Sequence, residues 1–298
     1  MSDSNLLAKC CLVADRVGGD PTHFMAESAL ESVGLDWRFL SFRVEPERVA
    51  DALAGADALG FHGVRLRGRY ADRPPMVAAR TERATRTGRL THLTRHEGAL
   101  QGDDATGPAL VESFAASLGD DACDPAGKRV LVLGAGGAAP SVVDVLVERG
   151  ASYVGVADRS ADRAAAVVLG AQRARDTDAR PVSDALAADV QPLAWEAEWL
   201  EWPDGVDWVV STASWPKEDN AAVAKAVGPD LEGVSLVVDL GVGASRSPLL
   251  LAAEGRGAGT LDGLPLLVAE TALALEAWTG EAIDRATIRE AAEEFLGF

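Results

Sequence analysis

The hexapeptide GAGGAA at residues 134–139 has the composition and spacing of a turn that binds a nucleotide phosphate. It follows the apolar run VLVLG and precedes a segment with helical apolar spacing, so its backbone N–H groups would open a helix. The first glycine would permit the tight turn, and the two central glycines would let the backbone approach a pyrophosphate. The predicted cofactor-binding residues of this turn are Gly134, Ala135, Gly136, Gly137 and Ala138. The alternative is a strand-to-helix turn that binds no ligand.

A carboxylate follows this turn at the expected separation. Asp158 ends the second apolar run, YVGVAD, and lies 24 residues after Gly134, close to the roughly 20 residues typical of a ribose-binding acid. Such a carboxylate accepts hydrogen bonds from both ribose hydroxyls and repels a 2′-phosphate, whereas Arg159 and Ser160 could bind that phosphate. The segment therefore predicts NAD or NADP as the cofactor, with a slight preference for NAD.

Three arginines alternate along the segment GVRLRGRY. If the whole segment is a strand, Arg65, Arg67 and Arg69 share one face. Planar guanidinium groups bind carboxylate or phosphate in bidentate fashion, so the pattern favours an anionic substrate. A solvated strand face is the alternative interpretation.

The candidate groups for proton transfer are His62, Tyr70 and Asp104. An imidazole transfers protons near neutral pH, and His62 lies just before the arginine segment. The phenol of Tyr70 could protonate an alkoxide or an amine, and Asp104 could take a polar or cation-binding role. A surface histidine, a packed tyrosine and a solvated turn are the alternatives. His92 and His96 have no third ligand fixed by spacing, so no metal site is predicted.

The elements that must position these groups follow two patterns. From about residue 128 to residue 245, apolar runs alternate with helical segments, which indicates a doubly wound, Rossmann-type parallel sheet. The first hundred residues also alternate strand and helix patterns, and two helical segments close the chain. We therefore predict an α/β protein with two lobes. They are a substrate-binding domain over residues 1–105, onto which helices within 264–298 pack, and a dinucleotide-binding domain over residues 106–263, with a cleft between the lobes.

The composition restricts the partners and the compartment. The chain of 298 residues has 46 acidic and 28 basic residues, and its net charge of −18 disfavours binding to nucleic acid or to an anionic membrane. The three cysteines form no disulfide framework, the N-terminus lacks a signal-peptide pattern, and no apolar run approaches the roughly 18 residues of a membrane span. These features predict a soluble, cytoplasmic protein that binds a small molecule.

Along nearly its whole length the chain resembles the shikimate dehydrogenase family. The similar segments are GLDWRFLSFRVEPE, GAGGAA, ADRSADRA, VVDLGVGASRSPLL and LDGLPLLVAETALALEAWTG. The resemblance implies the two-lobed fold of that family, a nicotinamide cofactor, and a monomer or a homodimer. It also places Thr212, Ala213 and Gly263 near the cofactor.

The first lobe departs from the family pattern. No lysine occurs from residue 10 to residue 127, where the family has its catalytic lysine, and Thr106 stands in place of the catalytic aspartate. Both members of the pair that transfers the proton of a secondary alcohol are therefore missing. The predicted substrate-binding residues are Thr22, Arg65, Arg67, Thr91, Thr106 and Glu270, the last in place of a glutamine.

The predicted function is that of a shikimate-dehydrogenase-like, NAD(P)-dependent oxidoreductase with a divergent active site. Its substrate would be a small molecule other than shikimate. The arginines favour an anionic substrate, and the added charges of Glu27 and Glu270, where the family has neutral amides, suit an amine or imine group. The alternative is a non-catalytic NAD(P)-binding protein that acts as a sensor or a partner subunit.

Overall fold

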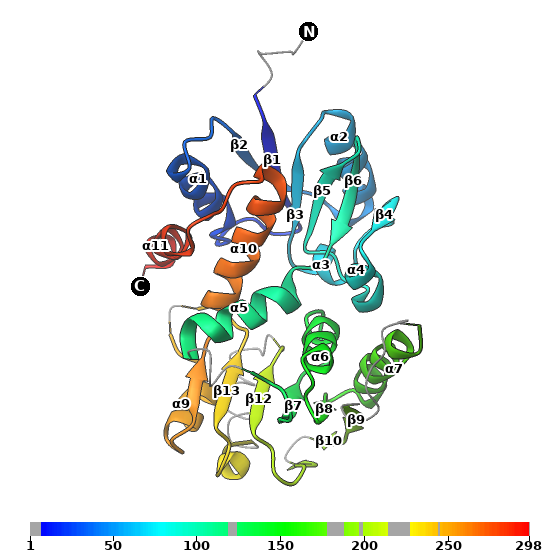
Figure 1. Ribbon diagram of the computed structural model, residues 1–298, viewed down its shortest axis with the longest axis vertical. Coiled ribbons are helices and arrows are strands. Elements are labelled where there is room, and N and C mark those ends of the chain that lie inside the picture. Colours follow the sequence, from blue (N-terminus) through cyan, green and yellow to red (C-terminus); the bar gives the residue numbers. More distant parts are fainter. Residues whose placement is uncertain are drawn as a thin grey trace. The chain divides into compact units, whose positions relative to one another are not determined.

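The computed structural model describes residues 7–118, 124–177, 188–196, 199–213, 227–243 and 245–297. The chain divides into two compact units (Figure 1). Unit 1 comprises Met1–Ala109 and Leu267–Phe298, and unit 2 comprises Leu110–Leu266. Within the described residues, no helix has the length and apolarity needed to span a bilayer.

Unit 1 is built on a mixed sheet of six strands. They are β1 (Lys9–Ala14), β2 (Arg38–Arg43), β3 (Gly63–Leu66), β4 (Ala79–Arg80), β5 (His92–His96) and β6 (Ala99–Asp103). Their order is β2-β1-β3-β5-β6-β4. The strands β2, β1 and β3 run parallel, and the antiparallel hairpin of β5 and β6 extends the sheet from β3. The run KCCLVA is buried along β1 because this strand is central and covered on both faces.

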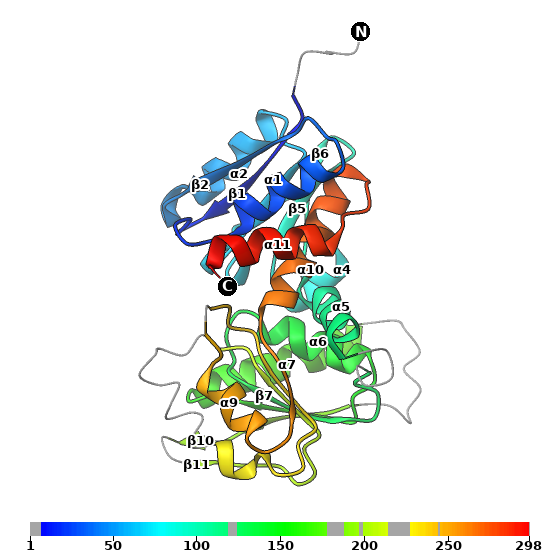
Figure 2. The ribbon, with the colours of Figure 1, turned by 90° about the vertical axis from the view of Figure 1, so that its left-hand side faces the viewer.

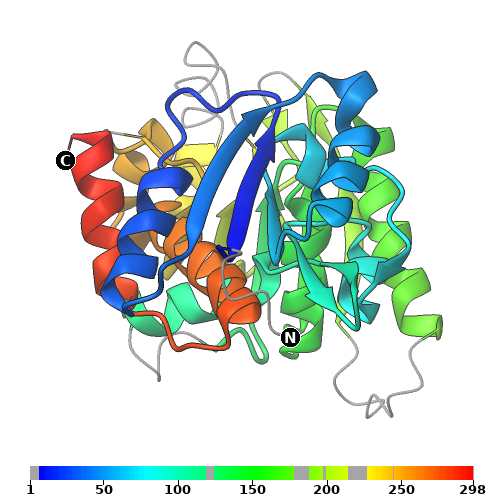
Figure 3. The same ribbon diagram turned by 90° about the horizontal axis from the view of Figure 1, so that it is seen from above.

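Helices cover both faces of this sheet. The helices of unit 1 are α1 (Thr22–Ser32), α2 (Val49–Ala58), α3 (Arg69–Asp72), α4 (Glu82–Thr87) and α11 (Arg285–Leu296). Two further helices, α5 (Thr106–Leu118) and α10 (Leu264–Thr279), each contain a boundary between the units. The helices α1 and α11 lie side by side on one face of the sheet, and α2 lies on the other (Figures 2 and 3).

The packing of α10 on β3 positions the polar groups of unit 1. Trp278 Nε1 donates a hydrogen bond to the carbonyl oxygen of Leu93 at 2.9 Å, and a side chain at Gly63 would overlap the Trp278 indole. Glu270 precedes Trp278 by about two helical turns. This register brings Glu270 over the end of β3, where Arg65 lies.

The strand β3 is shorter than the sequence pattern predicts. It ends at Leu66, Gly68 has a φ of 57°, and α3 begins at Arg69. The prediction that the three arginines share one strand face is therefore wrong. Arg65 lies in the strand and is buried, Arg67 follows the strand, and Arg69 is exposed on the helix.

Unit 2 has a parallel sheet, as predicted. Its six strands are β7 (Arg129–Leu133), β8 (Tyr153–Ala157), β9 (Asp189–Leu193), β12 (Trp208–Ser211), β13 (Leu236–Asp239) and β14 (Gly259–Leu261). They have the order β14-β13-β12-β7-β8-β9, and every neighbouring pair is parallel. A separate hairpin consists of β10 (Trp195–Glu196) and β11 (Trp199–Leu200).

The helices of unit 2 lie on both faces of its sheet (Figure 2). Those that lie in the described residues are α6 (Ala139–Glu148), α7 (Ala161–Thr177) and α9 (Pro248–Glu254), with a short 3-10 helix at Gly228–Leu231. α9 packs on the face that carries Leu131, Val209 and Val237, and α6 and α7 cover the opposite face. The strand order reverses between β7 and β12, which is where ligands of doubly wound sheets bind, beyond the carboxyl ends of the strands.

Candidate active site

The candidate site of unit 2 is the turn between β7 and α6. Gly134 has a φ of 97°, a conformation that residues with a side chain rarely adopt. A Cβ atom at this position would lie only 2.7 Å from the Cβ of Ala213. Both the backbone conformation and the contact with the chain after β12 therefore require glycine here.

Two side chains hold this turn against the neighbouring strands. Thr212 Oγ1 donates a hydrogen bond to the carbonyl oxygen of Gly134 at 2.7 Å. The backbone N–H of Ala135 donates to Asp158 Oδ2 at 2.8 Å. The turn is therefore fixed from β12 on one side and from β8 on the other before any ligand binds.

The next three backbone N–H groups are available to a ligand. Those of Gly136, Gly137 and Ala138 make no hydrogen bond with any residue that the structure describes. They lie at the start of α6, a helix of ten residues, where unpaired N–H groups and the helix dipole favour a phosphate. The arrangement fits the pyrophosphate of a dinucleotide.

Asp158 is already engaged within the protein. Its side chain is buried, and Oδ1 accepts hydrogen bonds from the backbone N–H of Ser160 at 2.8 Å and from Arg163 Nη2 at 2.7 Å. With Ala135 on Oδ2, both carboxylate oxygens have partners. Arg163 was not among the predicted cofactor-binding residues. Its position in the first turn of α7, five residues after Asp158, was the available signal.

Gly263 is a second position in unit 2 where two stretches of backbone come close together. Its N–H donates a hydrogen bond to the carbonyl oxygen of Gly241 at 3.2 Å, and a side chain here would overlap the backbone of Leu240, just after β13. Glycine is therefore required where the chain enters α10.

The candidate site of unit 1 is a buried cluster in which three arginines surround Glu270. Arg65 Nη2 lies 2.6 Å from Glu270 Oε2, and Arg67 Nη1 lies 3.7 Å from the same oxygen. Arg89 Nη1 lies 3.7 Å from Oε1, which also accepts a hydrogen bond from Thr106 Oγ1 at 2.6 Å. We call these five residues the arginine–glutamate cluster.

Arg89 is the member of this cluster that the sequence analysis missed. Its Nε lies 3.1 Å from Asp72 Oδ1, and its Nη1 donates to Thr106 Oγ1 and lies 4.0 Å from Asp104 Oδ1. Since Arg89 stands two residues before Thr91 in an extended segment, alternation of side chains could have placed both on one side.

The electrostatics of the cluster keep Glu270 ionised. Burial by itself would raise the pKa of this carboxyl, but the guanidinium groups of Arg65, Arg89 and Arg67 outweigh that effect and hold the pKa at about 2. For Arg89, burial lowers the pKa, but the facing carboxylates of Glu270, Asp104 and Asp72 raise it above its ordinary value. The cluster is therefore a set of charged groups near neutral pH.

The remaining predicted residues of unit 1 mostly surround this cluster. Thr91 Oγ1 accepts a hydrogen bond from the backbone N–H of Ala105 at 2.8 Å. Asp104 is fully buried and accepts from the backbone N–H of Thr106 at 3.1 Å. Thr22 is buried at the start of α1, and its N–H donates to Asp20 Oδ1 at 2.9 Å. Asp20 Oδ2 in turn lies 3.1 Å from Nε of Arg67, which belongs to the cluster.

The structure does not bring His62 or the Tyr70 hydroxyl to this cluster. His62 lies before the first residue of β3, at the end opposite to Arg67, and the centroid of its ring lies 4.7 Å from that of Trp37, with the two rings tilted by 52°. Burial, with nearby positive charge, lowers its pKa. The Tyr70 hydroxyl donates to the carbonyl oxygen of Val44 at 2.5 Å, and burial raises its pKa.

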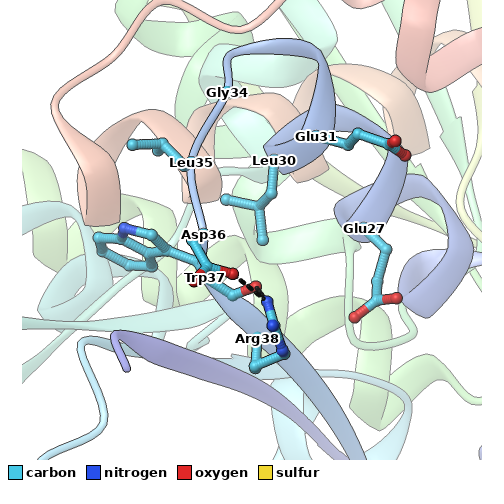
Figure 4. A pocket seen from close by; sticks show the side chains of 8 residues that line it. All are labelled: Glu27, Leu30, Glu31, Gly34, Leu35, Asp36, Trp37 and Arg38. Carbon is cyan, nitrogen blue, oxygen red and sulfur yellow. Dashed lines mark hydrogen bonds and ion pairs between the residues drawn. The ribbon is translucent and has the colours of Figure 1, made fainter. Parts of the chain in front are cut away.

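A pocket of about 450 Å³ lies elsewhere in unit 1, between α1 and β2 (Figure 4). Its lining residues are Glu27, Leu30, Glu31, Gly34, Leu35, Asp36, Trp37 and Arg38. Asp36 and Arg38 form an ion pair at 2.7 Å beside it. Glu27, one of the two added glutamates, lines this pocket and is not part of the arginine–glutamate cluster, whereas none of the other predicted site residues lines the pocket. Among the described residues, no three His, Cys, Asp or Glu side chains converge as metal ligands.

Comparison with known proteins identifies relatives over most of the chain. No protein-family profile matches it. The shikimate dehydrogenase (NADP(+)) of Citrifermentans bemidjiense is 33% identical over 279 residues, which cover 90% of each chain. That of Geobacter metallireducens is 31% identical over 257 residues, covering 86% of this chain and 85% of the relative.

Solved structures share the fold. Shikimate 5-dehydrogenase from Thermus thermophilus, in complex with NADP(H) and shikimate, superposes with a TM-score of 0.80 at 24% identity, covering 97% of this chain and all of that chain. A 5-ketofructose reductase from Gluconobacter sp. strain CHM43 superposes with a TM-score of 0.79 at 23% identity, covering 97% of this chain and 99% of that chain. These matches confirm the predicted two-lobed α/β fold. With the identity to the curated relatives, they establish that the chain belongs to the shikimate dehydrogenase family.

Proposed function

We propose that the protein is an NADP(H)-dependent oxidoreductase that acts on a small alcohol or carbonyl compound other than shikimate. The observation that carries the proposal is the turn at Gly134, whose conformation and unpaired N–H groups fit a pyrophosphate. The curated relatives are NADP(+)-dependent dehydrogenases. In this proposal unit 2 binds the dinucleotide and unit 1 binds the substrate.

NADP is a better candidate than the NAD that the sequence analysis favours. The preference for NAD depended on an Asp158 carboxylate that binds both ribose hydroxyls. Both of its oxygens instead hold Ala135, Ser160 and Arg163. Arg159 is exposed just after Asp158, and Arg163, which pairs with Asp158, has a side chain that is 62% exposed. Exposed guanidinium groups at these two positions suit a 2′-phosphate.

In this proposal the arginine–glutamate cluster takes the place of the catalytic lysine and aspartate that the family has and this chain lacks. The nicotinamide of a bound cofactor would supply the hydride that reduces a carbonyl carbon, or accept it in the reverse direction. Arg67 and Arg89 retain 28% and 13% side-chain exposure, so their guanidinium groups can donate hydrogen bonds to the carbonyl oxygen and polarise the carbonyl for reduction. Arg65, with 1% exposure, acts as the buried support of Glu270.

The proton that completes the alcohol comes from water in this proposal. Glu270 is ionised near neutral pH and has no proton to give. The hydroxyl proton of Tyr70 is directed to Val44, and His62 lies at the other end of β3. Asp104 remains a positioning residue, because it is buried against the N–H of Thr106 and near Arg89.

The experiment that tests the proposal combines a binding titration with a turnover screen. We expect the protein to bind NADPH more tightly than NADH, and to oxidise NADPH with a carbonyl compound from a panel of ketoses, keto acids and imines. Shikimate with NADP(+) should give no turnover at a rate normal for the family, because the lysine–aspartate pair is absent. Cofactor binding without any turnover would favour a non-catalytic sensor, and failure to bind either cofactor would refute the proposal.

A further inference from the structure

We infer that Glu270 is an internal counter-ion that occupies the position where an anionic ligand would bind the three arginines of unit 1. The substrate is therefore uncharged at this point, a polyhydroxylated ketone or alcohol without a carboxylate or phosphate group there. The substrate assignment rests on the proposed function, whereas the role of Glu270 as a counter-ion does not.

The geometry of Glu270 is that of a bound carboxylate. One oxygen lies 2.6 Å from Arg65 and 3.7 Å from Arg67, and the other accepts from Thr106 at 2.6 Å and lies 3.7 Å from Arg89. A ligand carboxylate between three guanidinium groups and a hydroxyl would make the same contacts. Since α10 delivers this group from within the chain, a carboxylate already occupies the space between the three guanidinium groups.

The charge balance around the cluster also opposes a second anion. The three guanidinium groups face four carboxylates, which belong to Asp20, Asp72, Asp104 and Glu270. An incoming carboxylate would lose its hydration and add charge of the sign already in excess. The ion pairs with Glu270 therefore remove the reason for expecting an anionic substrate. Because the same ion pairs engage the Glu270 carboxylate, it is also not available to bind an ammonium or imine group of a substrate.

The groups that remain accessible suit hydroxyls. Asp20 and Asp72 retain 14% and 37% side-chain exposure and accept hydrogen bonds, and the partly exposed Arg67 and Arg89 donate them. A hydroxyl both donates and accepts, so it can bridge an arginine and an aspartate without any change of charge. A polyhydroxylated substrate offers several such groups at once.

A chemical-rescue experiment tests the counter-ion. In the Glu270→Ala protein the position is vacant, so sodium acetate, balanced with sodium chloride at constant ionic strength, should raise the midpoint of thermal unfolding by about 5 °C. The wild type and Asp36→Ala should show no such rise. Asp36→Ala is the matched control because it removes one carboxylate from an ion pair outside the cluster. Absence of rescue, or equal rescue of the control, would overturn the inference.

If Glu270→Ala does not fold in chloride, its refolding from denaturant is compared in sodium acetate and in sodium chloride, and recovery of folded protein only in acetate is the expected result. The substrate class is tested on the wild type with NADPH and a pair of compounds that differ in charge, D-fructose and 2-keto-D-gluconate. We expect kcat/KM to be at least about tenfold higher for the ketose. A preference for the keto acid would overturn the substrate assignment. No turnover with any carbonyl compound would refute the proposed function, while the acetate experiment would still decide the role of Glu270.

Discussion

At the scale of single residues, Glu270 shows how the same charge changes its role with its surroundings. An isolated buried carboxylate would be neutralised, but Arg65 and Arg89 make the ionised form the stable one. The guanidinium groups depend on it in return, because Arg65 is almost fully buried. Removal of either partner leaves an uncompensated charge in the protein interior. This lowers the free energy of unfolding more than removal of an exposed ion pair does.

This dependence predicts a stability loss at acidic pH. The folded-state pKa of Glu270, about 2, is below its ordinary value of 4.5. The stabilisation is therefore complete above pH 4.5 and is lost as the pH falls from 4.5 towards 2, on the order of 3 kcal/mol in all. Chemical unfolding at stepped pH values measures this effect. Glu270→Gln should lack that part of the slope, and equal slopes for the two proteins would contradict the prediction.

Arg89 provides a second prediction at this scale. Arg89→Lys keeps the positive charge but loses the planar fork that contacts Asp72 and Thr106, so hydrogen bonding to the substrate carbonyl oxygen should weaken. We expect kcat/KM for the carbonyl substrate to fall about 10²-fold, with the dissociation constant of NADPH unchanged. Arg83→Lys is the matched control, because Arg83 pairs with Asp103 instead. An equal fall in both variants would argue against a specific role of Arg89.

At the scale of elements, the turn between β7 and α6 is formed by a short stretch of sequence but is held in place by side chains from neighbouring strands. Its conformation needs glycine at position 134, yet the side chains that hold it come from β8 and from the end of β12. Asp158 therefore acts as a tie between strands. This role explains why the carboxylate cannot be counted as a ribose ligand on its spacing alone.

Gly134→Ala tests the turn itself. The methyl group would strain the backbone and collide with Ala213, so we expect a loss of roughly 1–3 kcal/mol in unfolding free energy and at least about tenfold weaker NADPH binding. Gly150→Ala is the matched control, because its φ of 80° imposes a similar strain without a close contact. It should lose stability and keep its NADPH affinity, as measured by denaturant unfolding and titration calorimetry.

The start of α7 supplies a prediction on cofactor choice. Arg159→Gln removes a charge offered to the 2′-phosphate, so affinity for NADPH should fall about tenfold while affinity for NADH stays the same. Fluorescence titration with each cofactor measures both. Arg149→Gln removes a charge at the exposed end of α6 and should alter neither affinity. A parallel loss for NADH would show that Arg159 acts on the turn instead of the phosphate.

At the scale of the whole molecule, each unit has its own sheet and its own buried core, so ligand binding should stabilise the units unequally. We expect saturating NADPH to slow hydrogen exchange most strongly in peptides that cover residues 129–148. Their N–H groups include the three that have no partner among the described residues. NADH at the same concentration should protect them less. Exchange followed by mass spectrometry would contradict the assignment if protection were absent from this segment.

The sequence by itself determined the features that depend on local patterns. Continuous apolar runs predicted the parallel sheet of unit 2, because strands buried on both faces leave that signature. The glycine turn could also be located from the sequence, because the strand before it and the helix after it are adjacent to it in the chain. The family resemblance then supplied the two-lobed architecture. The alternation of arginines predicted too long a strand, because Gly68 and α3 end β3 after Leu66.

Only the tertiary structure decided which charges meet. Arg65 and Glu270 are 205 residues apart in the sequence, and no local periodicity links them. Their pairing follows from the register of α10 on β3, which Trp278 and Gly63 fix. For the same reason the sequence presented three arginines as a site for an anion, whereas the fold brings the chain's own carboxylate to them. Long-range packing, which brings distant side chains into one low-dielectric environment, therefore determines what this site can bind.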